Sequence, residues 1–294
     1  MIMTYSKWLA ENTASLSGKT VAISGSTGGI GRELCRYFLL LGAKLILLDR
    51  NMKKSLALAE ELKADFDGAK ISHVKVDLEN VDEVISAADE LLSVGVDFLI
   101  LNAGAYSIPR HRCSTGYDNV FQINFISPYV LAKLLLPHIS ARGGKVVAVG
   151  SIAHNYSVSD MSDIDFSGKG RASLVYGNAK RYLMLSMMSL REYGESVAVA
   201  HPGIALTNIT AHYPKLIFAL IKYPMKVIFM SPKKAALSIL KALFEKVEEY
   251  EWIGPRIFDV WGYPKKKKPL SFSHSERERV FAVAEKIYSE IINR

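Results

Sequence analysis

The stretch Thr20–Gly31, TVAISGSTGGIG, joins a short apolar run to a glycine-rich turn and then to a helical pattern. Its first five residues are apolar or β-branched, as in a buried strand. Glycines let the backbone turn sharply and approach a ligand closely. The helical pattern that follows, Ile30–Gly42, offers free N–H groups and a positive dipole end to an anion. The stretch therefore predicts a strand–turn–helix unit that binds the pyrophosphate of a dinucleotide.

The glycine spacing of this turn is G-x-x-x-G-x-G, not G-x-G-x-x-G, and it lacks the lysine of a P-loop. Tight packing alone could also explain a glycine-rich turn. Its place after the first strand of an α/β chain favours dinucleotide binding. We expect the whole turn to contact the cofactor: Gly25, Ser26, Thr27, Gly28, Gly29, Ile30 and Gly31.

Outward from this stretch, apolar strand patterns alternate with helical patterns. Near-continuous apolar strands separated by helices are typical of a parallel sheet covered on both faces, and right-handed crossovers then give a doubly wound, Rossmann-type fold. The expected strands are 20–24, 44–48, 71–76, 96–101, 145–149 and 197–200, with 250–253 at the edge. The expected helices are 30–42, 52–64, 81–92, 117–139, 173–193, 232–245 and 275–292.

The chain shows no flexible linker and no repeat at solenoid period, so we expect a single α/β domain over residues 1–294. Its core covers about residues 18–208, and residues 231–294 form a helical C-terminal extension. Between them, residues 209–230 are apolar and aromatic. We expect a lid there over a lipophilic substrate; the alternative is an interfacial helix on a membrane, and the two are compatible.

The composition is that of a globular protein, with 49% hydrophobic and 22% charged residues. The net charge of +8 is partly concentrated in Lys265–Lys268, where we expect a solvated loop, with contact to anionic lipid as the alternative. No basic surface with interleaved aromatics indicates nucleic-acid binding. The two cysteines lack CxxC or metal-ligand spacing. We therefore expect a cytoplasmic protein without a metal site, and no signal peptide at residues 1–10.

Asp49 ends the second expected strand, 18 residues after Gly31. An acidic residue at about this offset can accept hydrogen bonds from the adenosine ribose, and it repels a 2′-phosphate. Arg50 could instead pair with that phosphate. These residues favour NAD(H) and leave NADP(H) open.

Tyr176 and Lys180 lie four residues apart in a helical pattern, so their side chains share one face. A phenol normally loses its proton near pH 10, and a neighbouring cation lowers that pKa. The pair could therefore act as an acid/base near neutral pH. Taken alone, the pair could be an ordinary feature of an amphipathic helix. Motifs elsewhere in the chain are needed to distinguish this from a catalytic pair.

These motifs resemble, in order and spacing, the short-chain dehydrogenase/reductase family over about residues 18–208. Besides the glycine turn and the Tyr-x-x-x-Lys pair, the resemblance rests on Asp77-Leu78, Asn102-Ala103-Gly104, Asn124 and Ser151. The stretch Ser151–His154, 25 residues before Tyr176, and the stretch 115–118 are similar to the retinol-dehydrogenase-like branch. Ser24 and Leu101 depart from the family pattern without touching its reacting groups.

The resemblance implies the catalytic roles. Tyr176 would be the general acid/base, and Lys180 would lower its pKa and bind the nicotinamide ribose. Ser151 would hydrogen-bond the substrate oxygen, and Asn124 would hold a water that links Lys180 to solvent. His154 and His201 lie near this site, where we interpret them as satisfied structural histidines.

The resemblance also implies the remaining cofactor contacts: Asp77 and Leu78 at the adenine, Asn102, Ala103 and Gly104 beside the ribose, and Pro202, Gly203 and Thr207 at the nicotinamide. The expected activity is NAD(P)-dependent oxidoreduction of a lipophilic alcohol, ketone or aldehyde. A catalytically silent nucleotide sensor, or an epimerase or dehydratase, remains an alternative. We expect a homodimer or homotetramer in which subunits pair through helices 117–139 and 173–193. Such pairing needs apolar outer faces on these helices, and Met184, Met187 and Met188 indicate one on the second helix.

Overall fold

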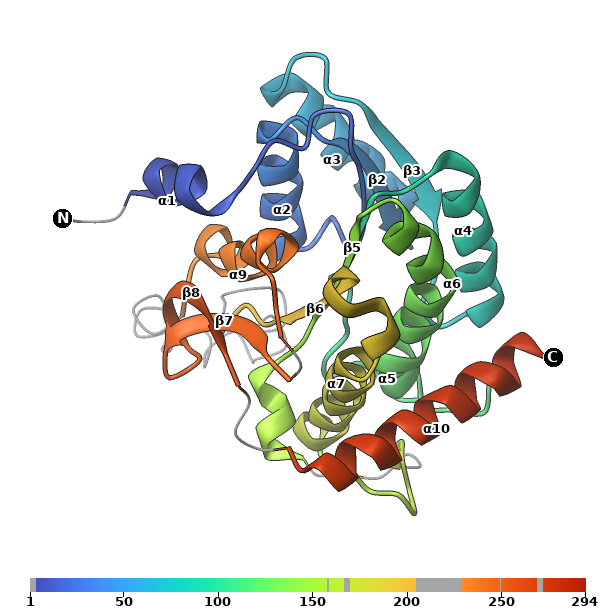
Figure 1. The fold of residues 1–294 in the computed structure, drawn as a ribbon. Helices are drawn as coiled ribbons and strands as arrows, with labels where there is room; N and C mark the ends of the chain where they lie inside the picture. The colour runs from blue at the N-terminus through green and yellow to red at the C-terminus, as the bar shows by residue number, and fades with distance from the viewer. Residues whose placement is uncertain (1–3, 158, 167–169, 205–228, 249, 269–271) are drawn as a thin grey trace, which may run out of the picture.

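The computed structural model describes residues 4–157, 159–166, 170–204, 229–248, 250–268 and 272–294 (Figure 1). In these ranges, eight strands form one sheet in the order β3-β2-β1-β4-β5-β6-β7-β8, parallel except for the last pair. The strands are β1 Thr20–Ser24, β2 Lys44–Asp49, β3 Ile71–Lys75, β4 Phe98–Leu101, β5 Lys145–Val149, β6 Val197–Ala200, β7 Trp252–Ile257 and β8 Trp261–Lys267. The predicted doubly wound sheet is confirmed.

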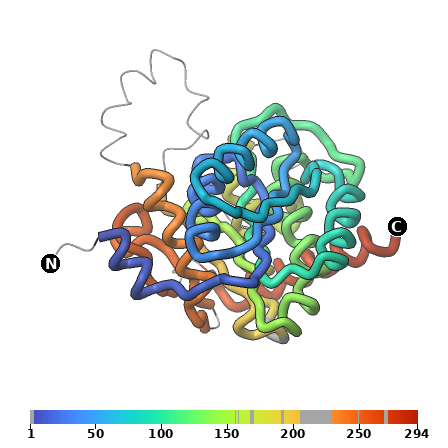
Figure 2. The backbone as a smooth tube through the Cα atoms, turned by 90° about the horizontal axis from the view of Figure 1, so that it is seen from above, coloured from blue at the N-terminus to red at the C-terminus, as the bar shows by residue number. Residues whose placement is uncertain are grey.

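The helices cover both faces of the sheet (Figure 1). One face carries α1 Tyr5–Asn12, α2 Gly29–Leu40, α3 Met52–Asp65 and α9 Pro232–Phe244. The other carries α4 Val81–Val94, α5 Asn119–Phe121, η1 Gln122–Ile126, α6 Ser127–Ala141, α7 Ala172–Met188 and α10 His274–Ile292. Short 3-10 segments are η2 Ile152–Tyr156 and η4 Arg191–Ser196. α1 and α10 lie at opposite sides of the molecule in both views (Figures 1 and 2).

Two hydrophobic cores follow from the alternation of side chains along each strand. In β2, Leu45 and Leu47 belong to the core beneath α2, whereas Ile46 and Leu48 belong to the core beneath α4 and α6. The segment Asn119–Ala141 is, among the described residues, long and apolar enough to cross a membrane, but 83% of its most apolar window is buried inside the protein. It is therefore packed here as a central core element.

Several predicted boundaries were wrong for physical reasons. The expected solvated loop Lys265–Lys268 is mostly strand, because residues 265–267 of β8 pair with β7. β8 is therefore the edge strand, where exposed lysines discourage pairing with another chain. The expected long helix at 117–139 begins only at Asn119, where Asp118 caps it, and it contains the π-helical turn η1. α1 was not predicted at all.

The helix expected over 173–193 ends at Met188, and a 3-10 segment follows it. Met184 and Met187 lie in the core, so they do not mark an outer apolar face as expected. α10 runs along the outside of α7 (Figure 1) and covers it. The expected lid at 209–230 falls almost entirely on residues 205–228, outside the described ranges, as does Thr207.

A buried ion pair fastens α10 to α7. Arg181 donates to both carboxylate oxygens of Glu276 at 2.5 and 2.6 Å, and its guanidinium lies 4.7 Å from the ring centroid of Phe272. The same guanidinium donates to the His154 carbonyl oxygen at 3.1 Å, in the turn that follows β5. The C-terminal extension is thereby tied to the segment that carries Ser151.

We predict that Glu276→Gln lowers the free energy of unfolding by about 3 kcal/mol, because it removes the negative charge that the buried Arg181 guanidinium contacts at 2.5 and 2.6 Å. Glu278→Gln, on the same helix with a 65% exposed side chain, is the matched control and should change stability by less than about 0.5 kcal/mol. Urea denaturation at pH 7 measures both. Equal effects of the two substitutions would contradict the anchoring role of the ion pair.

Candidate active site

The glycine turn forms an anion cradle at the N-terminus of α2. Gly28 is the N-cap, and no side chain caps this helix. A Cβ on Gly31 would lie 2.2 Å from the Gly25 carbonyl oxygen, and Gly25 itself has a φ of 67° and lies against Ala103. Only glycine fits these two positions. The first-turn N–H groups of α2 therefore remain available to a phosphate, as the sequence predicts.

Hydrogen bonds fasten the cradle to the end of β4. The Asn102 side-chain amide donates to the carbonyl oxygens of Ser24 and Gly25, at 3.1 and 3.0 Å. The Ser24 hydroxyl accepts from the Ala103 N–H at 3.0 Å and donates to the Ile100 carbonyl oxygen. Ser24, a departure from the family pattern, thus supplies the hydroxyl that joins β1 to β4.

A cavity of about 470 Å³ opens along the carboxyl ends of β1 to β4, where doubly wound sheets bind their ligands. The predicted cofactor residues that line it are Gly25, Thr27, Gly28, Gly29, Ile30, Gly31, Asp49, Arg50, Asp77, Leu78, Asn102, Ala103 and Gly104. Sequence reasoning missed further lining residues, among them Asn51, Lys54, Glu79, Ile108 and Ile123. Asn51 and Lys54 follow Asp49 closely in the sequence, at the start of α3. Their closeness to Asp49 in the chain could have identified them as lining residues.

Ser26 was expected to contact the cofactor, but its side chain is fully buried away from the cavity. Its hydroxyl donates to Oδ2 of Asp49 at 2.5 Å, and the Ser55 hydroxyl donates to the same oxygen at 2.8 Å. Ser55 also contacts His73 Nδ1 at 2.9 Å. The Asp49 carboxylate is therefore fixed by two buried hydroxyls while the residue lines the cavity, and its expected contact with the ribose remains a prediction.

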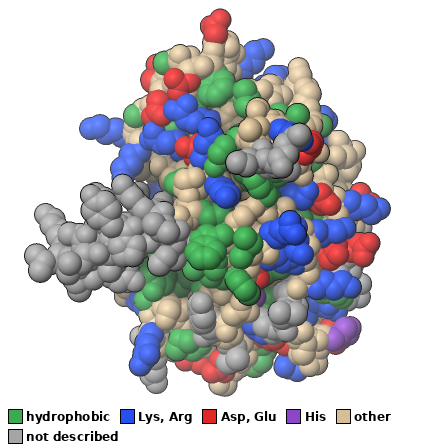
Figure 3. Space-filling view, turned by 90° about the vertical axis from the view of Figure 1, so that its left-hand side faces the viewer, with side chains coloured by type: hydrophobic (Ala, Val, Ile, Leu, Met, Phe, Trp, Pro, Cys, Tyr) green, Lys and Arg blue, Asp and Glu red, His purple; other side chains and the backbone are tan. Residues whose placement is uncertain are grey.

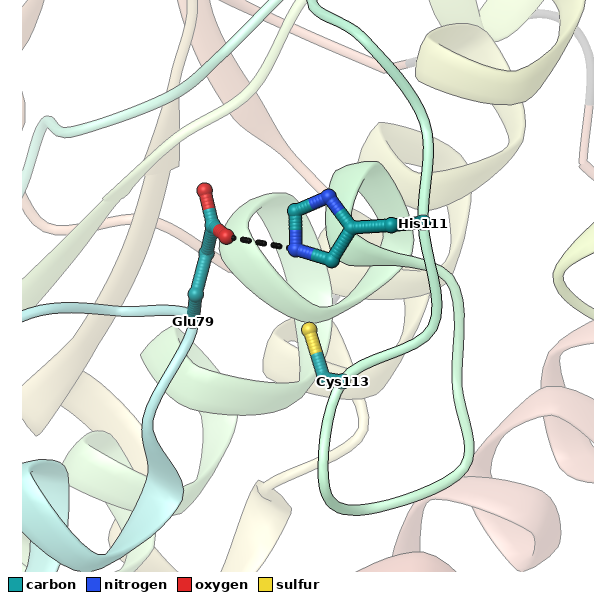
Figure 4. Close-up of side chains that lie close together, drawn as sticks. All are labelled: Glu79, His111 and Cys113. Atoms are coloured by element: carbon teal, nitrogen blue, oxygen red, sulfur yellow. Dashed lines mark ion pairs between the residues drawn. The ribbon is translucent and has the colours of Figure 1, made fainter.

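Arg50 lies at the rim of the cavity between two carboxylates. It is 3.3 Å from Glu79 and 3.7 Å from Asp77, and Glu79 also pairs with His111 Nε2 at 2.9 Å. Cys113 points toward the same place, and the ligand atoms of Glu79, His111 and Cys113 lie within 4.8 Å of one another (Figure 4).

The side chains of this cluster could serve as ligands of a transition metal, but their hydrogen bonds disfavour metal binding. The Asn119 amide, oriented by the Pro109 carbonyl and the His111 N–H, donates to Nδ1 of His111. Nε2 then carries the proton that it donates to Glu79, so it has no free lone pair for a metal. We interpret the cluster as a charge network at the rim of the cavity.

Tyr176 and Lys180 of α7 meet Ser151, which follows β5. Ser151 lies beside Tyr176, where its side chain acts to lower the pKa of the phenol, and Lys180 Nζ lies 5.9 Å from the centroid of the Tyr176 ring. Nζ donates to the Val149 carbonyl oxygen at 2.9 Å. A Cβ on Gly104, at the end of the cavity, would lie 3.5 Å from Nζ. The three predicted catalytic side chains are thus brought together beside the cofactor cavity.

Burial dominates the acid–base behaviour of this group. It raises the pKa of Tyr176 to about 12, with the Ser151 hydrogen bond acting in the opposite direction and the nearby Tyr106 ring adding to the rise. Burial also lowers the pKa of Lys180 to about 8. The pKa of Tyr176 is therefore raised in the protein chain itself, and not lowered as the sequence predicts, because desolvation of the phenol outweighs the effect of Ser151.

Asn124 lies in the π-helical turn η1 and is fully buried. Its amide nitrogen donates to the carbonyl oxygens of Ala105 and Val120 at 2.8 Å, and its Oδ1 accepts from the Ala105 N–H at 3.2 Å. Oδ1 also lies 2.8 Å from the position of a Cβ on Gly104. Asn124 therefore fixes the loop after β4 against Lys180, and its expected water-binding role remains a prediction.

His154 and His201 are buried and hydrogen-bonded. His154 Nδ1 donates to the Ser151 carbonyl oxygen at 2.6 Å, and burial lowers the pKa of the ring to about 4. His201 accepts from the Gly203 N–H at Nδ1, contacts Asp259 through Nε2, and stacks on Trp252 at 4.3 Å. Both are structural, as the sequence analysis interprets them.

Pro202 and Gly203 do not line the cofactor cavity. Gly203 has a φ of 77°, and a Cβ there would lie 2.7 Å from the Val260 carbonyl oxygen. A glycine is therefore required at position 203, both by the backbone conformation and by the close packing against the β7–β8 hairpin. The expected nicotinamide contact of this segment remains a prediction.

Comparisons with known proteins agree with this geometry. The family model for short chain dehydrogenases matches residues 19–215, so the chain belongs to that family. A relative from Schizosaccharomyces pombe, an uncharacterized oxidoreductase, is 27% identical and covers 80% of this chain and 75% of its own length. Polyprenol dehydrogenase of Mus musculus is 25% identical, over 81% of this chain and 75% of its own.

Retinol dehydrogenase 12 of Mus musculus is 27% identical, over 69% of this chain and 66% of its own, as the predicted resemblance to that branch leads one to expect. A solved structure from Mycobacterium paratuberculosis superposes with a TM-score of 0.74 at 22% identity, over 95% of this chain and 97% of that one. The chain is thus an NAD(P)-dependent oxidoreductase of the class that acts on CH–OH groups of small molecules.

We predict that Lys180→Met raises the free energy of unfolding of the cofactor-free protein by about 2 kcal/mol at pH 7. A pKa of about 8 in the folded state means that burying the lysine cation costs stability at every pH below 8. In the wild type this cost disappears as the pH rises from 8 toward the unfolded value, so the gap between the two proteins should close by about pH 10. Urea denaturation across this range measures it, and a gap independent of pH would contradict the shifted lysine.

Proposed function

We propose that the protein is an alcohol dehydrogenase or carbonyl reductase for a lipophilic alcohol, ketone or aldehyde, with Tyr176 as general acid/base. One observation carries the proposal: the Ser151 and Tyr176 side chains lie together beside Lys180, next to the cavity at the carboxyl ends of β1 to β4. The cofactor supplies or accepts the hydride.

The protein residues supply proton transfer and orientation. Because burial keeps the Tyr176 phenol protonated, its Oη can donate a proton to a carbonyl oxygen during reduction. The Ser151 hydroxyl would orient the same oxygen. Lys180, fixed by its bond to Val149, would bind the nicotinamide ribose and stabilise the phenolate after transfer.

The names of the relatives and the surroundings of Tyr176 support a lipophilic substrate. Polyprenol and retinol dehydrogenases are named for long apolar alcohols. The Tyr106 ring packs edge-on against Tyr176 at 5.4 Å and gives the reacting hydroxyl an apolar neighbour. The apolar stretch 209–230 would complete the pocket as a lid.

NAD(H) is the proposed cofactor, with NADP(H) as the alternative. Asp49 lines the cavity at the end of β2, where its carboxylate would repel a 2′-phosphate. Arg50, which could have bound that phosphate, is already paired with Glu79 and Asp77. The solved L-sorbose reductase of Gluconobacter frateurii, with a TM-score of 0.61 at 23% identity over 80% of this chain and 92% of that one, is complexed with NADPH. The fold itself therefore does not decide between the two cofactors.

For the assembled state we propose a cytoplasmic homodimer or homotetramer. α10 packs against α7, so the expected pairing of subunits through the outer face of α7 would be blocked. The subunits would instead meet through α10 or through another surface. The silent nucleotide sensor remains the second candidate function. It would explain the cofactor cavity but leaves the convergence of Ser151, Tyr176 and Lys180 without a purpose.

We predict that Tyr176→Phe lowers turnover by about 10²–10⁴-fold while cofactor affinity stays within about threefold, because only the exchangeable proton is lost. A screen of alcohols and ketones with NAD(H) and NADP(H) first identifies a substrate, and fluorescence titration measures cofactor binding. Tyr193→Phe is the control. Wild-type-like turnover by the Tyr176 variant would contradict proton transfer by Tyr176. Complete inactivity of the wild type across the screen would favour the catalytically silent nucleotide sensor.

For cofactor choice, we expect NADH to bind at least about tenfold tighter than NADPH, since the Asp49 carboxylate opposes a phosphate dianion. Asp49→Asn keeps the oxygen that accepts from Ser26 and Ser55 but removes the charge, so it should largely abolish the difference. The exposed Asp89→Asn on α4 is the control. Preference of the wild type for NADPH would show that Arg50 outweighs Asp49.

A further inference from the structure

Asp49 carries a carboxylate that is buried at the end of β2. Charged side chains of both signs are interspersed on the surface of the molecule, as the face in Figure 3 shows. Asp49, in contrast, is only 5% exposed. Side chains alternate along a strand, so Asp49 continues the row of Leu45 and Leu47 on the face of the sheet that carries α2 and α3. A buried carboxylate is costly unless hydrogen bonds satisfy it, so each of its two oxygens needs a partner.

One of these oxygens, Oδ2, already has its partners. The hydroxyl of Ser26, in the glycine turn, and the hydroxyl of Ser55, on α3, both donate to it. Both serines are themselves fully buried. Each oxygen of a carboxylate accepts about two hydrogen bonds, so side chains of the protein saturate Oδ2.

The count of protons determines which atom donates between Ser55 and His73. The Ser55 hydroxyl carries a single proton, which it donates to Asp49. The contact of 2.9 Å between Ser55 Oγ and His73 Nδ1 therefore has Nδ1 as its donor. His73 lies on the same face of β3 as Ile71, which packs against the core beneath α2. A directional chain of hydrogen bonds thus runs from His73 through Ser55 to Asp49 and fixes the orientation of the carboxylate.

The second carboxylate oxygen, Oδ1, accepts no hydrogen bond from the part of the chain that the structure describes. A nearly buried acceptor without a donor is costly. Asp49 lines the cavity at the carboxyl ends of β1 to β4. A molecule bound in this cavity would supply the missing donor, and the hydroxyl groups of a ribose are donors of this kind.

We propose that Ser55 is a positioning residue that sets the preference of this site for NAD(H). Together with His73, its hydroxyl holds Oδ2 of Asp49 in place, so that Oδ1 is left to accept a hydroxyl of the adenosine ribose. Ser55 is not among the residues that line the cavity, so it acts only through Asp49. The inference rests on the proposed binding of a dinucleotide in the cavity, with Asp49 at the ribose.

Fluorescence titration of the full chain with NADH and with NADPH tests the role of Ser55. Ser55→Ala removes only the hydroxyl and lets the carboxylate rotate. We expect NADH to bind about tenfold more weakly, the order of one hydrogen bond to a charged group. NADPH affinity should stay within about threefold, because a carboxylate in any orientation opposes a 2′-phosphate. A merely structural role would weaken the binding of both cofactors alike.

His73 offers a second test that includes a rescue. His73→Leu removes the donor to Ser55 and should weaken NADH binding by about three- to fivefold. His73→Asn places an amide nitrogen two bonds from Cβ, as Nδ1 is, so it should bind NADH within about twofold of the wild type. Neither variant changes a residue that lines the cavity.

A double-mutant cycle and a matched control separate positioning from general effects on the fold. In the Asp49→Asn background, Ser55→Ala should weaken NADH binding by less than about threefold, because no charged acceptor is left to orient. Ser186→Ala is the control. Ser186 is a fully buried serine of α7 whose hydroxyl has no hydrogen-bond partner among the described residues. This variant should bind both cofactors like the wild type.

The titrations distinguish two kinds of failure. If the wild type binds neither cofactor, or prefers NADPH, the proposed cofactor role of Asp49 fails, and the role of Ser55 fails with it. If the wild type prefers NADH but Ser55→Ala leaves the ratio of the two affinities unchanged, or Ser186→Ala shifts it as much, the positioning role alone is overturned. If Ser55→Ala does not fold, as judged by circular dichroism, equal NADH affinities of His73→Leu and His73→Asn overturn it instead.

Discussion

The Asn102 amide, bonded to the carbonyl oxygens of Ser24 and Gly25, is the contact on which the rest of the site depends. It fixes the carboxyl ends of the two central strands at the distance where the glycine turn can pass between them. A Cβ on Gly31 would lie 2.2 Å from the Gly25 carbonyl oxygen, so any larger residue would clash there and the turn has one available path. That path presents uncapped N–H groups of α2 to the cavity, and the neighbouring strand ends supply Asp49, Asp77 and Gly104 around it.

At the reacting end, burial governs the chemistry more than charge does. Tyr176 and Lys180 are both shifted toward their neutral forms, and the Lys180 cation is tolerated because its ammonium has a fixed carbonyl partner. The fold therefore holds an unfavourable charge next to a protonated phenol. Such a pair lowers the stability of the fold. In return, the polar groups are already positioned before a substrate binds, so little reorganisation is needed during the reaction. Asn124, by pinning the loop beside Gly104, keeps the lysine from relaxing away from the cavity.

The C-terminal third of the chain supports this centre from outside. Glu276 of α10 holds Arg181, which in turn holds the turn that carries Ser151 and His154. Trp252 of β7 lies between the rings of His154 and His201, and His201 reaches Asp259 in the exposed hairpin. A continuous set of packed and hydrogen-bonded groups thus runs from the β7–β8 hairpin to the candidate catalytic serine.

The sequence by itself determined the doubly wound sheet and the glycine turn, and it predicted the three side chains that meet beside the cavity, because hydrophobic periodicity and short-range spacing are properties of neighbouring residues. It could not determine the direction of the Tyr176 pKa shift, since desolvation depends on what packs around the phenol and not on Lys180 alone. It also missed the inward turn of Ser26, the pairing of Arg50 with Glu79, and the strand formed by Lys265–Lys267. Each of these depends on a partner distant in the chain, and only the tertiary structure brings such partners together.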